Sequence, residues 1–386
     1  MVRATLIYDG DLYTPQPLGR GSVLAVDGMI VATGTIARGE VEDALGVLGI
    51  ELQVVDARGC IVVPGLIDPH EHLLGSSGEE GFSSRSPEIF CTELIASGIT
   101  TVVGTLGTDT SMRTMAELLA KVKALEEEGL SAYMYSGGYT LPPVTVMGSL
   151  RNDLLFIDRV IGAGEIAVSD RRAVQPTIHE LAAAITEAYV GGLLSRKAGV
   201  THIHVGEGAA RLAPVRAVLD DFDVDPAAVY PTHVARTREL LSEAAALTHR
   251  GACVDIDTTD RDLPSALDSY VQDHGELERL TVSTDAGSTS PGMLIQQLAD
   301  CVHGGWSLES ILPLATTNTA RVLKLPAKGR LQCGCDADVL ALSAGVLEPV
   351  HLVARGVVLM EHGHVNARPT FLKQTNRLVM LSGEKD

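Results

Sequence analysis

The chain has 386 residues, of which 45% are apolar, so it can bury a large hydrophobic core. Its formal net charge is −19, from 49 acidic and 30 basic side chains. Such an acidic surface repels nucleic acid and anionic lipid, which excludes both as expected partners. No apolar run reaches the roughly 18 residues of a membrane span, and residues 1–10 lack a secretory signal.

The six cysteines are scattered along the chain and form no Cys-x-x-Cys units of the kind that binds zinc. Cys333 and Cys335 flank a glycine in a predicted turn, and their spacing does not match a metal site. Scattered cysteines of this kind are typical of reduced thiols in the cytosol. We therefore expect a cytoplasmic protein.

The first 60 residues predict a small β unit. Short strands are expected at 5–8, 22–26 and 29–33. Asp27-Gly28 stands between the last two, and such a pair between alternating apolar runs is typical of a hairpin turn.

From residue 60 onward, apolar strands alternate with amphipathic helical stretches, of which 114–128, 178–195 and 236–250 are the clearest. Eight strands alternating with helices, over the length of a typical barrel of about 250 residues, indicate an α/β fold with a parallel (β/α)8 TIM barrel. A doubly wound open sheet is the main alternative, but no Gly-x-Gly-x-x-Gly motif follows a first strand. The predicted strands are 60–70, 100–106, 131–137, 165–169, 201–206, 229–234, 253–258 and 280–285.

After a helical stretch at 307–323 the β pattern returns. The short strands predicted there are 337–342, 351–353 and 356–360. The β segments at the two ends of the chain are each too small to be stable alone. We therefore expect residues 1–60 and 330–386 to pair into one small β-sandwich domain, and residues 61–329 to form the catalytic barrel. Residues 373–386 predict either a loosely held tail or an oligomer contact.

The stretch 64–72, Pro-Gly-Leu-Ile-Asp-Pro-His-Glu-His, closes the first predicted barrel strand. Side chains alternate along a strand, so His70 and His72 point the same way. The apolar run before them predicts a strand buried on both faces, which argues against two solvated histidines. Imidazole is the commonest metal ligand, and the pair therefore predicts a metal site.

Polar residues at the carboxyl ends of barrel strands are where barrel enzymes carry out their chemistry. Four more titratable residues are predicted at these ends, namely Glu165 opening strand four, His204 on strand five, His233 on strand six and Asp285 on strand eight. Together with His70 and His72, they can hold two zinc-like ions with one carboxylate bridging them. Two such ions lower the pKa of a bound water and leave room for a bridging hydroxide.

His202 is an alternative to His204 as the ligand on strand five. It lies on the same strand face two residues earlier, about 6 to 7 Å deeper in the barrel. We assign His204 to the metal and His202 to a position in the barrel interior where its hydrogen-bonding groups are satisfied.

Together with further motifs, these residues resemble the amidohydrolase superfamily, and within it the isoaspartyl dipeptidases. The general marks also include Lys328-Gly-Arg-Leu and Asp336-Ala-Asp-Val-Leu. The subgroup marks are Gly78-Glu79, Val103-Gly-Thr-Leu-Gly-Thr108-Asp, Gly138-Tyr139, Ser169-Asp-Arg-Arg172 and Pro231-Thr-His233-Val-Ala-Arg236. The resemblance covers nearly the whole chain, and it implies a metal-dependent hydrolase that assembles as a homo-oligomer.

One position departs from the family pattern. In the family, a lysine carboxylated by carbon dioxide commonly bridges the two metals at the site that matches Glu165. No lysine occurs between Lys123 and Lys197 in this chain, so no carboxylated lysine is expected on strand four. A glutamate supplies the same single charge and two oxygens. We expect Glu165 to bridge two zinc ions, or another divalent metal, with a local backbone adjustment at Gly164.

The resemblance also implies a site for a small β-aspartyl dipeptide, which carries one ammonium and two carboxylates. Glu79 matches the position that holds the ammonium. Arg172 and Arg236 match those that hold carboxylates, and their places just beyond strands four and six favour this role over surface ion pairs. Thr108 and Thr289 match positions that add hydrogen bonds, with Thr289 standing where the family has a serine.

In the implied mechanism, Tyr139 donates a hydrogen bond to the oxyanion, while Asp285 acts as general base and then as general acid. The hypothesis is therefore an isoaspartyl dipeptidase that cleaves the isopeptide bond of β-aspartyl dipeptides with a zinc-activated hydroxide. One alternative keeps the metal site but acts on N-acyl amino acids or cyclic amides. Another is an inactive relative that serves as a scaffold, but every ligand position is filled by a competent residue.

Overall fold

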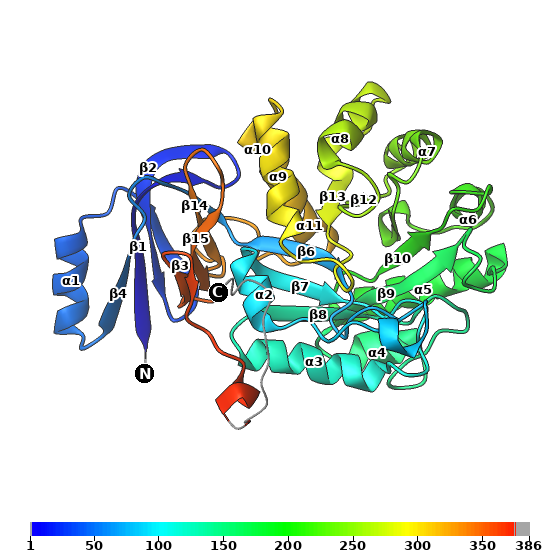
Figure 1. Cartoon of the computed structure of the whole chain (residues 1–386), viewed down its shortest axis with the longest axis horizontal. Coiled ribbons are helices and arrows are strands. Elements are labelled where there is room, and N and C mark those ends of the chain that lie inside the picture. The colour runs from blue at the N-terminus through cyan, green and yellow to red at the C-terminus, as the bar shows by residue number, and fades with distance from the viewer. Residues whose placement is uncertain (1, 374, 376–386) are drawn as a thin grey trace.

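The structure is a computed structural model that describes residues 2–373 and 375, and it consists of a barrel beside a large β-sheet (Figure 1). Of the predicted tail, residues 374 and 376–386 lie outside the described residues. In the part of the chain that the structure describes, no helix is both long and apolar enough to cross a membrane. All six cysteines are free thiols.

Eight parallel strands form a TIM-barrel-like α/β fold. Six of them pair in the order β11-β10-β9-β8-β7-β6, and β12 pairs with β13. The hydrogen bond from Asp285 N to His70 O, 3.1 Å long, joins the loop after β13 back to β6. The strands are β6 (Leu66–Glu71), β7 (Ile99–Gly104), β8 (Ser131–Ser136), β9 (Val160–Val168), β10 (Val200–Val205), β11 (Val229–Thr232), β12 (Val254–Asp257) and β13 (Leu280–Ser283).

Helices follow the strands and pack their apolar faces on the outside of the barrel (Figure 1). In α3, the buried residues Leu118, Val122 and Leu125 recur at helical spacing, and Thr114 with Glu117 forms a capping box at its start. The predicted helix 178–195 is found with the same bounds. The helices are α2 (Cys91–Ala96), α3 (Met115–Glu127), α4 (Leu150–Phe156), α5 (Ile178–Ser195), α6 (Ala213–Asp221), α7 (Arg238–Thr248), α8 (Leu263–Gln272), α9 (Met293–His303), α10 (Leu308–Ile311) and α11 (Thr317–Val322).

The prediction of one helical stretch over 307–323 is wrong. Two short α-helices, α10 and α11, are separated there by a 3-10 helix at Leu312–Ala315. Pro313 lies in that segment and has no backbone N–H to continue an α-helix.

Strands from both ends of the chain share one nine-stranded sheet. β5 pairs in parallel with β1 and antiparallel with β14, which joins the two ends. The predicted hairpin at Asp27-Gly28 is confirmed, because Val26 pairs with Met29 between β2 and β3. The strands are β1 (Arg3–Tyr13), β2 (Pro17–Val26), β3 (Met29–Gly34), β4 (Glu51–Asp56), β5 (Cys60–Pro64), β14 (Val339–Ser343), β15 (Pro349–Ala354), β16 (Val357–Glu361) and β17 (His364–Val365), with α1 (Arg38–Val47) beside β4.

The β-sandwich that we predicted from the two ends of the chain is not confirmed, since these strands belong to a single sheet. Buried apolar residues such as Leu12, Val23, Val62 and Val353 pack together on this sheet. The domain boundaries at residues 60 and 330 stay a prediction.

The first predicted barrel strand, 60–70, is in fact two strands in different sheets. β5 pairs with β14 in the nine-stranded sheet, and β6 begins the barrel. Gly65 stands between them, where an added Cβ would overlap the side chain of Thr100. The apolar run did not indicate this break, because both strands are buried and have the same apolar sequence pattern.

Lys328 connects the segment before β14 to the barrel. Its side chain is only 4% exposed, and its Nζ donates to Ser131 Oγ at 2.6 Å and to Asp338 Oδ2 at 2.5 Å. Asp336 Oδ2 lies 2.8 Å from the same nitrogen. Burial lowers the pKa of Lys328, but the two carboxylates outweigh this effect and raise the pKa above its ordinary value.

Replacing Lys328 with methionine should destabilise the protein by about 3 to 5 kcal/mol, because the buried carboxylate of Asp338 loses its cation. The shift in the urea unfolding midpoint measures this change. Lys324→Met is the matched control, because Lys324 is exposed and makes no ion pair within the described residues, and it should stay within about 0.5 kcal/mol of the parent. A Lys328→Met protein as stable as that control would show that the ion pair between Lys328 and Asp338 does not stabilise the fold.

Candidate metal centre and substrate cavity

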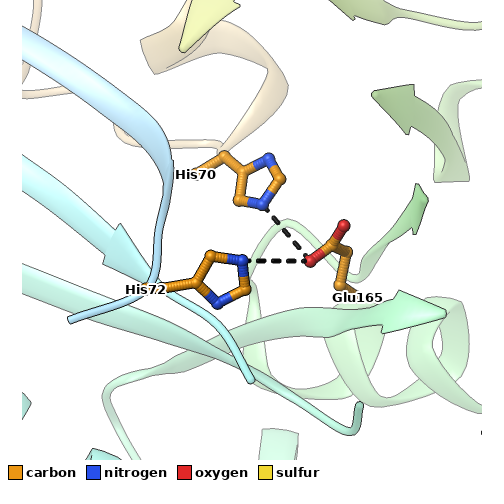
Figure 2. Close-up of side chains that lie close together, drawn as sticks. All are labelled: His70, His72 and Glu165. Carbon is orange, nitrogen blue, oxygen red and sulfur yellow. Dashed lines mark ion pairs between the residues drawn. The ribbon is translucent and has the colours of Figure 1, made fainter. Parts of the chain in front are cut away.

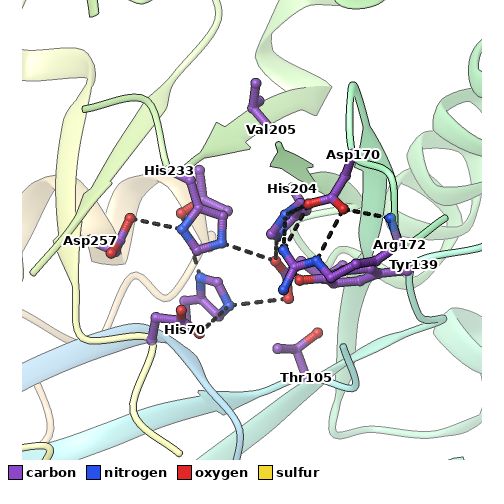
Figure 3. Close-up of polar contacts among 12 residues, drawn as sticks. His70, Thr105, Tyr139, Asp170, Arg172, His204, Val205, His233 and Asp257 are labelled. Atoms are coloured by element: carbon purple, nitrogen blue, oxygen red, sulfur yellow. Dashed lines mark hydrogen bonds and ion pairs between the residues drawn. The ribbon is translucent and has the colours of Figure 1, made fainter. Parts of the chain in front are cut away.

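The six predicted ligands lie together at the carboxyl-terminal end of the barrel strands. Figures 2 and 3 label all of them except Asp285. Their positions are His70 in β6, His72 just after β6, Glu165 in β9, His204 in β10, His233 directly after β11 and Asp285 just after β13. This is the end of a TIM barrel at which active sites are found.

One group of ligand atoms forms around Glu165 Oε2. His70 Nε2 lies 3.3 Å and His72 Nε2 3.7 Å from this oxygen (Figure 2). The same two nitrogens lie 3.4 Å and 3.1 Å from Asp285 Oδ1. Two imidazoles and two carboxylates therefore converge on one point.

A second group forms around the other oxygen of the same carboxylate. His204 Nδ1 lies 2.6 Å and His233 Nε2 3.2 Å from Glu165 Oε1. Each oxygen of Glu165 thus faces a different pair of histidines, as a carboxylate that bridges two cations would.

The residues present fit a pair of divalent metal ions. His70 Nε2, Glu165 Oε2 and Asp285 Oδ1 are buried and have no hydrogen-bond partner among the described residues. Leaving such atoms unpaired costs about 1 to 3 kcal/mol each, and more for charged groups. A cation bound among them would satisfy all three, and nitrogen and oxygen donors of these types are ligands that zinc accepts.

Glu165 is entirely buried, and burial alone would raise the pKa of its carboxyl group. The neighbouring His70 and His204 outweigh this effect and hold the pKa well below its ordinary value. The carboxylate is therefore charged.

The prediction that Glu165 opens its strand is wrong, because β9 begins at Val160. The backbone adjustment expected at Gly164 is visible as a φ of +141°, a conformation that favours glycine. A Cβ at this position would lie 2.6 Å from His202 O, and the pairing of β9 with β10 is irregular there. Only glycine fits the close approach of these two strands.

His202 lies deeper in the barrel than His204 and forms no ion pair with Glu165 among the described residues. The prediction that its hydrogen-bonding groups are satisfied there is wrong, because both ring nitrogens are buried without a hydrogen-bond partner in the described part of the chain. Its ring stacks on Tyr135, with centroids 5.0 Å apart, and its edge meets His70 at 4.7 Å. Burial lowers the pKa of His202 well below its ordinary value, so the ring is neutral. It forms a separate group with His70 and Asp255 that could also hold an ion.

A cavity of about 460 Å³ opens above the predicted ligands. Five of the predicted substrate residues line it, and they are Glu79, Thr108, Tyr139, Arg172 and Arg236. The ligands His72, His204 and Asp285 reach the same cavity. Thr289 is exposed and does not line it, whereas its neighbour Ser288 does.

Two guanidinium groups with defined partners lie in the cavity wall. Arg172 Nη1 donates to Glu79 Oε1 at 2.9 Å. Arg236 donates through Nε to Asp260 Oδ1 at 3.0 Å and through Nη1 to Val205 O at 2.9 Å. The cavity therefore presents both signs of charge at fixed positions.

Tyr139 brings a phenol group to the edge of the predicted centre. Its hydroxyl lies 2.9 Å from His204 Nδ1, and the residue is 5% exposed. Burial raises the pKa of Tyr139 well above its ordinary value, so the hydroxyl keeps its proton and can donate it in a hydrogen bond.

A family model described as "Amidohydrolase family" matches residues 61–384. The chain belongs to the amidohydrolase family. This finding confirms the family predicted from the motifs, together with a metal-dependent hydrolase as its class.

Solved structures show which amidohydrolases this chain is similar to. A β-aspartyl dipeptidase from Fervidobacterium islandicum AW-1 is 33% identical, with a TM-score of 0.89 over 95% of this chain and 100% of that one. The same enzyme in complex with a β-Asp-Leu dipeptide is 32% identical, also with a TM-score of 0.89, over 96% of this chain and 99% of that one. A triazine hydrolase variant has a TM-score of 0.67 at 16% identity over 96% of this chain and 97% of that one, which shows the shared fold.

Among curated proteins, an imidazolonepropionase from Symbiobacterium thermophilum is 26% identical over 90% of this chain and 92% of its own length. Relatives of different activity thus resemble most of this amidohydrolase.

Two carboxylates behind the histidines were missed by the sequence reasoning. Asp170 Oδ2 lies 2.8 Å from His204 Nε2, and Asp257 Oδ2 lies 2.8 Å from His233 Nδ1 (Figure 3). A signal for both existed, because Asp257 ends β12 and Asp170 belongs to the motif that contains Arg172. They were overlooked because only residues resembling metal ligands or substrate contacts were collected.

Glu165→Ala should remove metal from this amidohydrolase, because both predicted ions depend on the same carboxylate. We expect close to two zinc ions per chain in the zinc-saturated, desalted parent and fewer than one in the variant, as measured by elemental analysis. Glu207→Ala, at an exposed carboxylate beside the cavity, should keep both ions. A folded Glu165→Ala protein that retains two zinc ions would show that the bridging assignment is wrong.

Proposed function

We propose that this amidohydrolase is a metal-dependent isoaspartyl dipeptidase that hydrolyses the isopeptide bond of β-aspartyl dipeptides. One observation carries the proposal: the carboxylate of Glu79 and the guanidinium groups of Arg172 and Arg236 lie in the wall of a cavity that the predicted metal ligands also reach. The resemblance to a β-aspartyl dipeptidase whose structure contains β-Asp-Leu supports it.

The charges of the cavity complement those of a β-aspartyl dipeptide. Glu79 would bind the ammonium group, and the guanidinium groups of Arg172 and Arg236 would bind the two carboxylates through the N–H groups that Asp170 and Asp260 do not occupy. The side chains of Glu79 and Arg172 are 51% and 31% exposed, so a ligand can reach both. Thr108 Oγ1 is buried without a partner among the described residues and is available for a further hydrogen bond.

Two divalent ions, zinc by the type of ligand, would be held by His70, His72, Glu165, His204, His233 and Asp285, with Glu165 between them in place of a carboxylated lysine. When bound, they supply Lewis acidity for the amide carbonyl and lower the pKa of water.

The remaining chemistry falls to Tyr139 and Asp285. The Tyr139 hydroxyl donates a hydrogen bond to the carbonyl oxygen as negative charge develops on it. Burial raises the pKa of Asp285, but His70 and His72 outweigh this effect and hold it below the ordinary value. Asp285 is therefore ionised, and it can accept a proton from the attacking water and pass it to the leaving amine.

Thr289 as a substrate contact, the homo-oligomeric assembly and the cytoplasmic location remain predictions. They do not bear on the chemistry proposed for the cavity.

Asp285→Asn should lower kcat for β-Asp-Leu by roughly 10² to 10⁴-fold, because the amide cannot take the proton from water. Release of aspartate by the zinc-loaded protein measures the rate. Asp300→Asn, at an exposed carboxylate of α9, should keep the parent rate. Full activity of Asp285→Asn would refute the mechanism, and no aspartate release from any of a panel of β-aspartyl dipeptides would refute the function.

The second candidate function is hydrolysis of N-acyl amino acids or cyclic amides. The 26% identity to an imidazolonepropionase over most of the chain favours it. Such substrates have no free ammonium group for Glu79 to bind.

Glu79→Gln separates the two functions. For a β-aspartyl dipeptide, kcat/KM should fall by about 10 to 100-fold, since hydrogen bonds to a charged group contribute about 1.5 to 3 kcal/mol. Assays of β-Asp-Leu, an N-acetyl amino acid and a hydantoin measure the preference. Glu127→Gln, at the exposed end of α3, is the control. If Glu79→Gln leaves kcat/KM for β-Asp-Leu unchanged, the dipeptide assignment is wrong.

A further inference from the structure

The loop after β9 places one buried carboxylate between the predicted metal centre and the predicted substrate cavity. Asp170 lies two residues beyond Val168, the last residue of that strand, and is 5% exposed. It contacts two side chains with different predicted functions, namely His204 and Arg172 (Figure 3).

On the side of the metal centre, Asp170 determines how the imidazole of His204 is oriented. Asp170 Oδ2 lies 2.8 Å from His204 Nε2, and Arg172 Nη2 and Arg236 Nη1 lie 3.0 Å and 3.4 Å from the same nitrogen. A neutral imidazole carries one proton; when that proton is on Nε2, the Asp170 carboxylate accepts it in a hydrogen bond, because the guanidinium groups beside it have no acceptor. The lone pair then lies on Nδ1, which faces Glu165 Oε1 at 2.6 Å.

On the side of the cavity, Asp170 holds the guanidinium group of Arg172. Oδ1 accepts from Arg172 Nε at 3.0 Å, and Oδ2 accepts from Nη2 at 2.7 Å. Oδ1 also accepts from the backbone N–H of Arg172 at 2.8 Å. This fork-to-fork pairing leaves Nη1 for the cavity, where it meets Glu79.

The backbone that carries Asp170 is itself closely packed. A Cβ at Gly206 would lie 2.5 Å from the Asp170 Cβ, so only glycine fits the end of β10 here. Gly208 N donates to Ser169 O at 2.7 Å, and Ser169 Oγ donates to Arg211 O at 2.8 Å. These contacts fix the carboxylate in place before any ligand binds.

Asp257 provides an internal comparison. It holds His233 through Nδ1 at 2.8 Å, while His233 Nε2 faces Glu165. Its other oxygen accepts hydrogen bonds from Thr259, and among the described residues no hydrogen bond joins Asp257 to Arg172 or Arg236, the latter being held by Asp260 instead. Asp257 therefore shares the contact with a predicted metal ligand but lacks the contact with the substrate side.

We propose that Asp170 is a positioning residue that acts on both halves of the site, orienting His204 toward the metal and Arg172 toward a carboxylate of the substrate. The proposal rests on the proposed function for its second half only. Removing the carboxylate should weaken metal binding and substrate binding together.

The test compares Asp170→Asn with Asp257→Asn. Zinc affinity is measured by competition with a chromogenic chelator, and KM and kcat for β-Asp-Leu are measured at saturating zinc. Both variants should bind zinc about 10 to 100-fold more weakly, the usual cost of losing a carboxylate behind a histidine ligand. Only Asp170→Asn should also raise KM, by about 10-fold, since Arg172 then loses the carboxylate that orients its guanidinium group.

Unchanged zinc affinity in Asp170→Asn, or a zinc defect without a rise in KM, would overturn the proposal. Circular dichroism reports whether the variant folds, and Asp170→Ser is examined in the same assays if the asparagine variant does not. If the parent cleaves no β-aspartyl dipeptide, the proposed function fails, whereas the chelator competition still decides whether Asp170 orients His204.

Discussion

The site depends on one buried carboxylate whose two oxygens face different histidine pairs. Glu165 is inaccessible to solvent, yet it is charged because imidazole groups surround it. A buried charge is costly unless it is paired, and here the pairing comes from strands β6, β10 and β11 at once. The barrel must therefore bring these strand ends to one point, and the positive φ of Gly164 lets β9 approach β10 closely where it carries the carboxylate.

A series of hydrogen bonds and ion pairs runs through Glu165 and reaches the cavity. In order, its residues are Asp257, His233, Glu165, His204, Asp170, Arg172 and Glu79. Each contact is within hydrogen-bond distance, and in the low dielectric of the interior such linked groups hold one another in orientation. The geometry of the predicted ligands and the geometry of the predicted substrate residues are consequently parts of a single network.

The fold is shared by amidohydrolases with different substrates, so it does not decide what this chain hydrolyses. A triazine hydrolase at 16% identity has the same architecture, and an imidazolonepropionase resembles most of the chain. What separates the candidate substrates is the charge at the cavity wall. Glu79 beside Arg172 and Arg236 suits a ligand with one ammonium and two carboxylates, and the similarity to a β-aspartyl dipeptidase supports the same class of substrate.

The sequence by itself determined the alternation of strands and helices, the family, and the positions of residues such as His70 and Asp285 at strand ends. The alternation and the strand ends are local features, because they depend on periodicity and on which residue follows an apolar run, whereas the family followed from the resemblance of the motifs. Only the tertiary structure decided that 60–70 divides between two sheets, that Glu165 lies inside β9, and that Asp170 and Asp257 stand behind the histidines. Each of these depends on which strand lies beside which, and residues far apart in the chain carry no local signal of that contact.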